Sequence, residues 1–308
     1  MLDGPAPRVL GTTIPVIANA RAGGGHSGDS LDGLREAFAA QGITARVMAP
    51  HAGTLEDALR EALAEKPPVV VAAGGDGTVS AVAEALRGTG TALAVVPFGT
   101  FNHFAKDLGI PLDTDEAIRV LLDGRVVDVD LGEVNGRTFV NNASLGLYPG
   151  MVRTRDKLRR RFGHSKRAAM AWAMLAAIRR TPLLTLTLQA DREVQPCRSP
   201  FVFVGNNAYA MEGFDIGTRE RLDGGELSIY TTPRCSFLGL ASLALRALAG
   251  RLHQAEDFDV AGARRLRVET PHTRLLVATD GEINIMDTPL EFRILPRALK
   301  VLVPRKDP

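Results

Sequence analysis

The hydrophobic pattern of the chain changes its period once, near Arg125–Asp130. Before this point, short apolar runs such as Val69–Ala73 alternate with amphipathic stretches that have helical spacing. Strands that alternate with helices form a mostly parallel sheet with helices on its faces. The pattern therefore predicts an N-terminal α/β domain over residues 1–127. Such sheets bind ligands in the loops at the carboxyl ends of their strands.

After the change, apolar and polar residues alternate over short segments, which is typical of antiparallel strands with one buried face. Asn135-Gly136 separates two of these segments, Val126–Val134 and Arg137–Leu145, and both turn residues tolerate the positive φ of a type I′ hairpin. The pattern predicts an antiparallel, β-rich and sandwich-like domain over residues 128–289. Two helical stretches, Lys166–Arg180 and Phe237–Leu252, interrupt the predicted strands.

Composition limits the classes of function. A chain of 308 residues is long enough for two domains, and a formal net charge of +2 gives no general attraction to nucleic acid. Cys197 and Cys235 are too few for a disulfide framework and favour the reducing cytosol. No segment approaches the roughly 18 consecutive apolar residues of a membrane-spanning helix. We therefore expect a cytoplasmic protein that meets a membrane only at its surface.

A glycine-rich motif, Gly74–Thr78 (GGDGT), directly follows the apolar run Val69–Ala73 and precedes a helical stretch. Glycines let backbone N–H groups approach a bulky anion, and a helix N-terminus adds unpaired N–H groups and a positive dipole end. Asp76 would repel a phosphate unless a cation lies between them, so a magnesium–nucleotide complex is the natural ligand. The alternative is a tight strand-to-helix turn without a ligand; the aspartate among the glycines favours the nucleotide.

Two further loops at predicted strand ends suit phosphates. Gly23–Gly28 matches the glycine spacing of a dinucleotide-binding loop, but no acidic residue follows at the end of the next predicted strand, which argues against NAD. Pro97–Asn102 follows another predicted strand and has similar chemistry. The sequence contains no Walker A motif, so a P-loop enzyme is excluded.

In their order along the chain, these motifs resemble the diacylglycerol kinase catalytic-domain family, which includes sphingosine kinases and bacterial soluble lipid kinases. The resemblance extends over nearly the whole chain, whereas GGDGT alone is shared with NAD kinases. The matching segments are Asn19–Gly23, Gly74–Thr78, Pro97–Pro111, Asp130–Gly132, Phe139–Gly146 and Asp280–Glu282.

The resemblance implies an ATP-dependent kinase that uses Mg²⁺ and transfers the γ-phosphoryl group to a hydroxyl of a lipid such as diacylglycerol. It implies that Asp76 acts on the magnesium ion and the phosphates, and that a C-terminal tail, about residues 290–308, packs on the first domain. The expected partner is a lipid at a membrane surface and not a nucleic acid; a homodimer stays open. The implied nucleotide contacts are Asn19, Gly74, Gly75, Gly77, Thr78, Thr100 and Asn102.

The chain departs from the family pattern at two motifs. Phe101-Asn102-His103 stands where the family usually has Gly-Asn-Asp, so an imidazole replaces a carboxylate and we expect weaker use of MgATP. Leu222–Gly225 (LDGG) stands where some bacterial members have Leu-Asp-Asp-Gly at a structural magnesium ion. Asp223 is the ligand predicted to remain, and one carboxylate of that second metal site is missing.

Asp280 and Glu282 are the candidates for a catalytic base. A lipid alcohol has a pKa far above neutrality, so phosphoryl transfer to it benefits from a positioned base. The period of a strand would place both side chains on one face, with Gly281 between them. We assign Glu282 as the base and Asp280 as a group that orients the acceptor or the metal, although the roles could be exchanged. The alternative is a simple Asp-Gly turn between two strands.

A basic segment, Arg153–Arg167, precedes the helical stretch of the second domain. It is either a solvated face or a contact with anionic headgroups, at about 1 kcal/mol per basic residue. Two other functions stay open: an NAD-kinase-like phosphotransferase, and a catalytically weak homologue that binds lipid or nucleotide. His103 and Gly224 motivate the latter.

Overall fold

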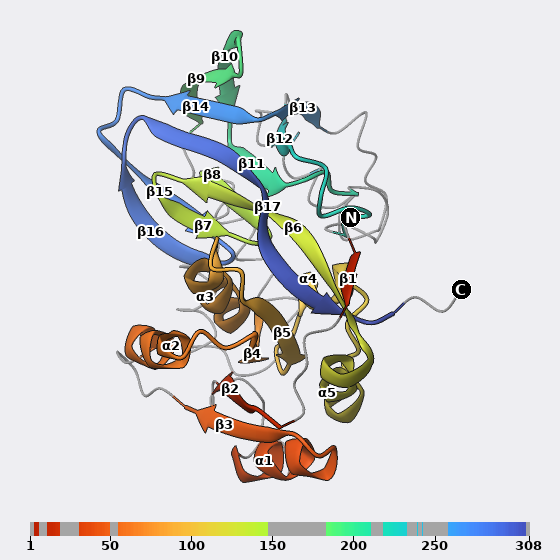
Figure 1. The fold of residues 1–308 in the computed structure, drawn as a ribbon. Coiled ribbons are helices and arrows are strands. Elements are labelled where there is room, and N and C mark those ends of the chain that lie inside the picture. The colour runs from red at the N-terminus through yellow and green to blue at the C-terminus, as the bar shows by residue number, and fades with distance from the viewer. Residues whose placement is uncertain are drawn as a thin grey trace. The chain divides into compact units, whose positions relative to one another are not determined.

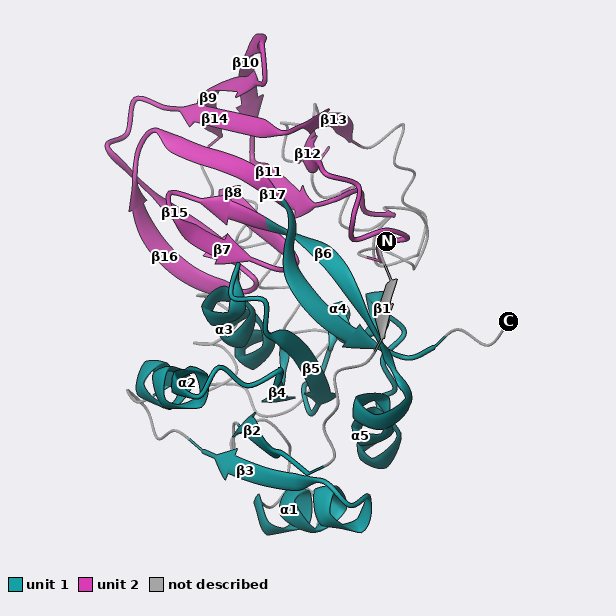
Figure 2. Cartoon of the chain, viewed as in Figure 1, with its two compact units in different colours: residues 1–131, 296–308 teal, residues 132–295 magenta. Residues whose placement is uncertain are grey.

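A computed structural model (Figure 1) describes residues 3–5, 11–18, 31–49, 55–146, 183–210, 218–232, 239, 242 and 258–305. The chain divides into two compact units (Figure 2). Unit 1 contains Met1–Leu131 and Pro296–Pro308, and unit 2 contains Gly132–Leu295.

Unit 1 is built on parallel strands in the order β17-β5-β4-β2-β3. β4 and β5 lie inside this row and are buried along their whole length, which is why they appear in the sequence as continuous apolar runs. A short strand, β1 (Asp3–Pro5), pairs antiparallel with β6 (Arg125–Val134). The parallel strands are β2 (Thr13–Ala18), β3 (Thr44–Met48), β4 (Val69–Gly74), β5 (Ala92–Pro97) and the last part of β17 (Leu290–Val303).

The helices of unit 1 follow its strands along the chain. α1 buries Leu34 and Phe38 and ends before Gly42, whose φ of 74° breaks the helix. α5 begins after Asp113, whose carboxylate accepts a hydrogen bond from the Glu116 N–H at 3.0 Å. The described helices are α1 (Leu31–Ala40), α2 (Leu55–Ala64), α3 (Asp76–Leu86), α4 (His103–Asp107) and α5 (Thr114–Asp123).

The last part of β17 belongs to unit 1. It pairs in parallel with Ala92 and Leu93 of β5. The Arg297 N–H donates to Asp130 Oδ1 at 2.8 Å, and Asp130 is only 1% exposed. The carboxylate of this motif residue therefore holds the returning chain, which is a structural role.

Unit 2 consists of antiparallel strands in two sheets. One row has the order β10-β9-β14-β17, and the other has the order β13-β12-β11-β8-β15-β16. One apolar core draws on both rows, with Leu186 and Val268 from the first and Leu145 and Val204 from the second. The bounds are β9 (Leu184–Ala190), β10 (Glu193–Ser199), β11 (Phe201–Asn206), β12 (Leu227–Thr231), β13 (Asp259–Ala263), β14 (Arg265–Glu269), β15 (Arg274–Thr279) and β16 (Glu282–Asp287). The parallel-rich first unit and this antiparallel second unit confirm the predicted fold class.

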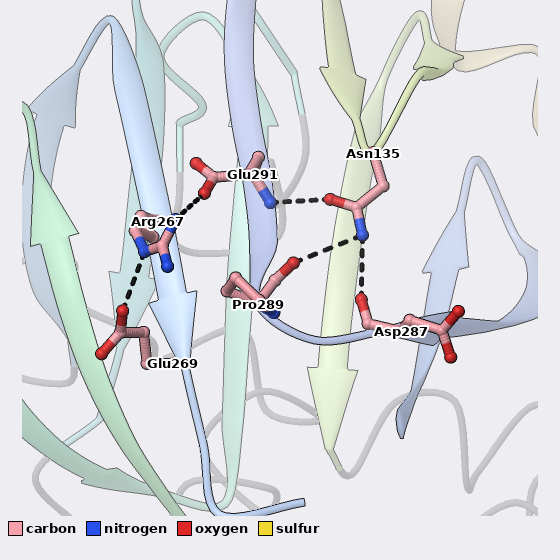
Figure 3. Close-up of polar contacts among 6 residues, drawn as sticks. All are labelled: Asn135, Arg267, Glu269, Asp287, Pro289 and Glu291. Carbon is pink, nitrogen blue, oxygen red and sulfur yellow. Dashed lines mark hydrogen bonds and ion pairs between the residues drawn. The ribbon is translucent and has the colours of Figure 1, made fainter. Parts of the chain in front are cut away.

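The predicted hairpin at Asn135-Gly136 is confirmed, since the two residues have φ values of 46° and 86°. The Asn135 side chain also fastens a neighbouring segment (Figure 3). Its Oδ1 accepts from the Glu291 N–H at 2.8 Å, and its Nδ2 donates to the Asp287 carbonyl at 2.9 Å. Glu291 also forms an ion pair with Arg267, which pairs with Glu269 as well. The turn residue thus joins the hairpin to the start of β17.

One predicted strand is wrong. The segment Arg137–Leu145 forms two strands, β7 (Arg137–Phe139) and β8 (Asn142–Gly146), with a bend at residues 140–141. β7 pairs with β6, whereas β8 pairs with β11 and β15 of the other sheet. The alternation is interrupted at the bend, where two apolar residues, Phe139 and Val140, are followed by two polar ones. The interruption marks a break in the strand, but the local pattern does not show that β8 pairs in the other sheet.

Several predicted features lie outside the described residues. They are Asn19, the loop Gly23–Gly28, the basic segment Arg153–Arg167, the helical stretch Lys166–Arg180 and most of Phe237–Leu252. These features stay predictions. Among the helices that the structure does describe, none is long and apolar enough to cross a membrane.

Candidate active site

The GGDGT motif forms the end of β4 and the start of α3. Gly75 is the N-cap residue, and no side chain caps the helix there. The N–H groups of Thr78 and Val79 bond to the Gly75 carbonyl at 2.9 and 3.1 Å. The first N–H groups of a helix, here those of Asp76 and Gly77, have no acceptor within the helix and lie at its positive end. The motif therefore has the chemistry of an anion site.

The glycines of this motif allow two strand-end loops to touch. A Cβ atom built on Gly99 would lie 2.7 Å from the Cα of Gly75, and one built on Gly75 would lie 3.1 Å from the Cα of Gly99. A Cβ on Gly74 would lie 2.5 Å from Thr78 Oγ1. These glycines are therefore required by backbone and side-chain packing within unit 1, in addition to any approach of a ligand.

Asn102 links the two loops. Its backbone is left-handed, with φ 51°, and its side chain closes a ring with Gly99 by accepting from the N–H and donating to the carbonyl, both at 2.9 Å. The Asn102 N–H donates to Asp76 Oδ2 at 3.1 Å. The side-chain amide is thus engaged inside its own loop, and Asn102 positions Asp76. A contact between Asn102 and a nucleotide stays a prediction.

The remaining predicted nucleotide contacts differ in their exposure to solvent. Gly77 and Thr100 are exposed, whereas Gly74 and Thr78 are buried, with Thr78 only 6% exposed. Asn19 lies outside the described residues. The structure therefore brings Gly74–Thr78, Gly99 and Asn102 together in unit 1, and leaves the first motif untested.

Asp280 and Gly281 form a turn, so the interpretation that placed Asp280 and Glu282 on one face of a strand is wrong. Both turn residues have positive φ, 48° and 86°, and Thr279 pairs with Glu282 across the hairpin β15–β16. The Asp-Gly pair has the backbone of a type I′ turn. The chain reverses between the two carboxylates, which gives them different surroundings.

The Asp280 carboxylate binds backbone N–H groups at the bend between β7 and β8. Oδ2 accepts from Val140 N–H at 2.8 Å, while Oδ1 accepts from Asn141 and Asn142 N–H at 2.8 and 3.1 Å. The Asp280 N–H in turn donates to the Asn142 carbonyl at 2.9 Å. Asp280 therefore fastens its own turn to the bend, and this ties both oxygens of the carboxylate to the backbone.

Arg219 binds the same bend and was not identified from the sequence. It is only 4% exposed and donates to the Val140 carbonyl at 2.7 Å and to Asn141 Oδ1 at 2.8 Å. It also donates to the Asn206 carbonyl at 3.1 Å and lies 5.1 Å from the ring centroid of Tyr209. This buried arginine has no distinguishing sequence pattern, because its partners at the bend, Val140 and Asn141, are more than 70 residues away in the chain.

Glu282 is 61% exposed at its side chain, in contrast to Asp280. Its Oε2 accepts from Arg137 Nη2 at 2.7 Å, and the Arg137 Nε donates to Thr279 Oγ1 at 3.3 Å. In the described part of the chain, Glu282 has no other side-chain hydrogen bond. Its carboxylate is therefore accessible to an acceptor hydroxyl, which a general base requires.

Asp280→Ala should lower the free energy of unfolding by about 2–5 kcal/mol, because three N–H groups at a largely buried bend would lose their acceptors. Asp280→Asn should cost less, since asparagine keeps one acceptor oxygen and tolerates positive φ. Urea unfolding at constant m-value measures both. Glu282→Ala is the matched control at the exposed neighbour and should change stability by less than about 1 kcal/mol. Equal losses in Asp280→Ala and Glu282→Ala would contradict the fastening role.

The predicted second metal ligand, Asp223, is bonded to an arginine. Its Oδ1 accepts from Arg221 Nε at 3.2 Å. A Cβ atom on Gly224, where the family's second aspartate would stand, would lie 2.6 Å from Asn207 Oδ1. The described residues contain no group of three or more His, Cys, Asp or Glu side chains that could hold a metal ion. The packing therefore leaves no room for the family's second carboxylate at position 224, and Asp223 as a metal ligand stays a prediction.

ATP and Mg²⁺, which the family pattern implies, fit the chemistry of the GGDGT loop. Asp76 Oδ1 has no hydrogen-bond partner among the described residues, and carboxylate oxygens suit Mg²⁺. Asp76 would hold the ion, and the backbone of Gly75–Thr78 would hold phosphate oxygens. When bound, Mg²⁺ supplies neutralisation of the phosphate charge.

Comparison with known families shows what each part of the chain is similar to. Residues 13–134 match the diacylglycerol kinase catalytic domain family. Residues 146–303 match the YegS C-terminal NAD kinase beta sandwich-like domain. Together the two matches span both structural units.

Individual relatives are similar along most of their length. A protein of Pseudomonas aeruginosa strain PAO1 named "Probable lipid kinase YegS-like" is 32% identical, over 89% of this chain and 91% of the relative. A diacylglycerol kinase of Bacillus subtilis strain 168 is 26% identical, over 83% of this chain and 84% of the relative. A crystal structure of a diacylglycerol kinase from Bacillus anthracis strain Sterne superposes with a TM-score of 0.67 at 20% identity, covering 94% of this chain and 96% of that one, which shows the shared fold.

Proposed function

This chain belongs to the diacylglycerol kinase catalytic-domain family, and we propose that it is an ATP-dependent lipid kinase. It would transfer the γ-phosphoryl group of ATP to a hydroxyl of a lipid alcohol such as diacylglycerol. The observation that carries this proposal is the loop at the start of α3. There, one oxygen of the Asp76 carboxylate has no hydrogen-bond partner among the described residues, and the first helix N–H groups have no acceptor within the helix. That combination suits a magnesium–nucleotide complex and suits few other ligands.

In this proposal the candidate site residues have different roles. Asp76 handles the metal and the phosphates, and Asn102 keeps it oriented through the backbone hydrogen bond of 3.1 Å. Glu282 accepts the proton of the acceptor hydroxyl, which becomes a better nucleophile for the phosphorus atom. Asp280 holds the turn that presents Glu282, as its three hydrogen bonds to the bend support.

The acceptor lipid belongs to a membrane, so we place the protein at a membrane surface during the reaction. The test is transfer of labelled phosphate from MgATP to a mixed lipid extract dispersed in detergent, compared with NAD as the acceptor. We expect a phosphorylated lipid and unlabelled NAD. Transfer to NAD alone would favour an NAD-kinase-like enzyme, which shares the beta sandwich-like second domain. ATP binding without transfer to either acceptor would favour a catalytically weak homologue.

A further inference from the structure

Two aromatic rings stack on the surface of unit 1 beside the GGDGT loop. The rings of Phe101 and His103 have centroids 5.5 Å apart and an interplanar angle of 12°. Phe101 is 54% exposed although one neighbour already covers it, and His103 is exposed as well. An exposed phenylalanine of this size leaves apolar area in water that a ligand could cover.

The loop that carries the rings is held in place. Phe101 is followed by Asn102, whose side chain closes the ring with Gly99 and whose N–H donates to Asp76 Oδ2. The stacked pair is therefore attached to the same hydrogen-bonded unit as the carboxylate that would handle the phosphates. The aromatic surface suits the base of a nucleotide, and the neighbouring GGDGT loop suits its phosphates.

We infer that Phe101 and His103 form a stacking platform for the base of the donor nucleotide. Stacking on an aromatic ring accepts any base, because every base has a π-face. The pair would compensate for the carboxylate that this chain lacks at position 103, by adding contact to the base where contact to the metal is missing. This inference rests on the proposed function, because it takes the donor to be a nucleotide.

A membrane surface is the other partner that could cover an exposed phenylalanine. The observations favour the base. Phe101 is the only large exposed apolar side chain in the loop Pro97–Asn102. Stable membrane attachment by side chains needs a larger apolar area or several cations.

The experiment compares two ligands of the full-length protein by calorimetry, MgATP and magnesium tripolyphosphate, which has the phosphates but no base. Phe101→Ala should weaken MgATP binding by about 5- to 30-fold and leave tripolyphosphate binding unchanged, because only the base loses its contact. Phe101→Tyr keeps a ring and should bind both ligands like the wild type. Leu112→Ala, which removes another exposed apolar side chain of unit 1 (51% exposed), should change neither affinity.

Three results would overturn the platform. Equal weakening of both ligands in Phe101→Ala would mean that the ring only shapes the phosphate loop. Unchanged MgATP affinity with lost co-sedimentation on vesicles of phosphatidylglycerol would assign Phe101 to the membrane, and unchanged behaviour in both assays would leave the ring without a ligand. In each of these cases wild-type MgATP binding leaves the proposed function intact, whereas a wild type that binds neither ligand would refute the kinase and the platform together.

Discussion

Asp76→Asn should reduce phosphoryl transfer by about 10³-fold or more, because the loop would lose the negative charge that holds the metal against the phosphates. Asparagine is nearly isosteric and can still accept the hydrogen bond that Asn102 N–H donates to the wild-type Oδ2. The loop should therefore keep its shape, and the loss should fall on the chemistry. The measurement is the initial rate of lipid phosphorylation at saturating MgATP, together with a thermal melt of the same sample.

Asp76→Ala gives the matched comparison, because it removes the charge and the acceptor for Asn102 together. We expect it to be as inactive as Asp76→Asn and slightly less stable. Turnover near the wild-type rate in a folded Asp76→Asn protein would refute the assignment of the GGDGT loop as the metal and phosphate site. A loss of activity that merely follows a loss of folded protein would assign Asp76 a structural role.

Glu282→Gln should lower the rate of transfer by about 10²- to 10⁴-fold, the usual effect of removing a general base. Nucleotide binding should be unchanged, because this residue has no predicted contact with the donor. The side chain is 61% exposed, and its ion pair with Arg137 is at the surface, so the stability of the fold should change by less than about 1 kcal/mol. Steady-state kinetics with MgATP and a detergent-dispersed lipid separates kcat from KM for both substrates.

Arg137→Met is the control for Glu282→Gln, since it breaks the same ion pair and leaves the carboxylate in place. We expect it to retain most of the activity. A fast Glu282→Gln enzyme would exclude this residue as the base. If Asp280→Asn were then inactive while fully folded, the two roles would be exchanged, even though the Asp280 oxygens are engaged by the bend. If neither change matters, the carboxylate-base mechanism does not apply to this protein.

Local chemistry was sufficient to predict the class of the fold. Apolar runs such as Val69–Ala73 are continuous because β4 is buried on both faces, and the later segments alternate because their strands have one buried face. Asn135-Gly136 specified its turn by its own backbone preferences. The position of the GGDGT motif was also predictable, because the motif lies between an apolar run and an amphipathic stretch, which is typical of a strand end followed by a helix. Each of these features depends on residues within a few positions of one another.

The roles of the site residues depended on contacts between distant segments. Asp280 binds the backbone of residues 140–142, which lie about 139 residues earlier in the chain. Asn135 and Glu291 are similarly distant in sequence, and Arg219 binds the same bend from a third segment. The interrupted alternation at Phe139–Asn142 marks a bend, but it cannot show that the chain leaves one sheet after Phe139 and enters another at Asn142, because strand pairing depends on distant partners. Gly75 was predicted only as a nucleotide contact, and only the packing of two loops against each other shows that a Cβ atom on Gly99 would clash with it. Sequence patterns report the period and burial of each segment, whereas hydrogen bonds between segments form only after the chain has brought them together. The tertiary structure therefore decided that the Asp280 carboxylate is tied to the backbone and that the Glu282 carboxylate is exposed at the surface.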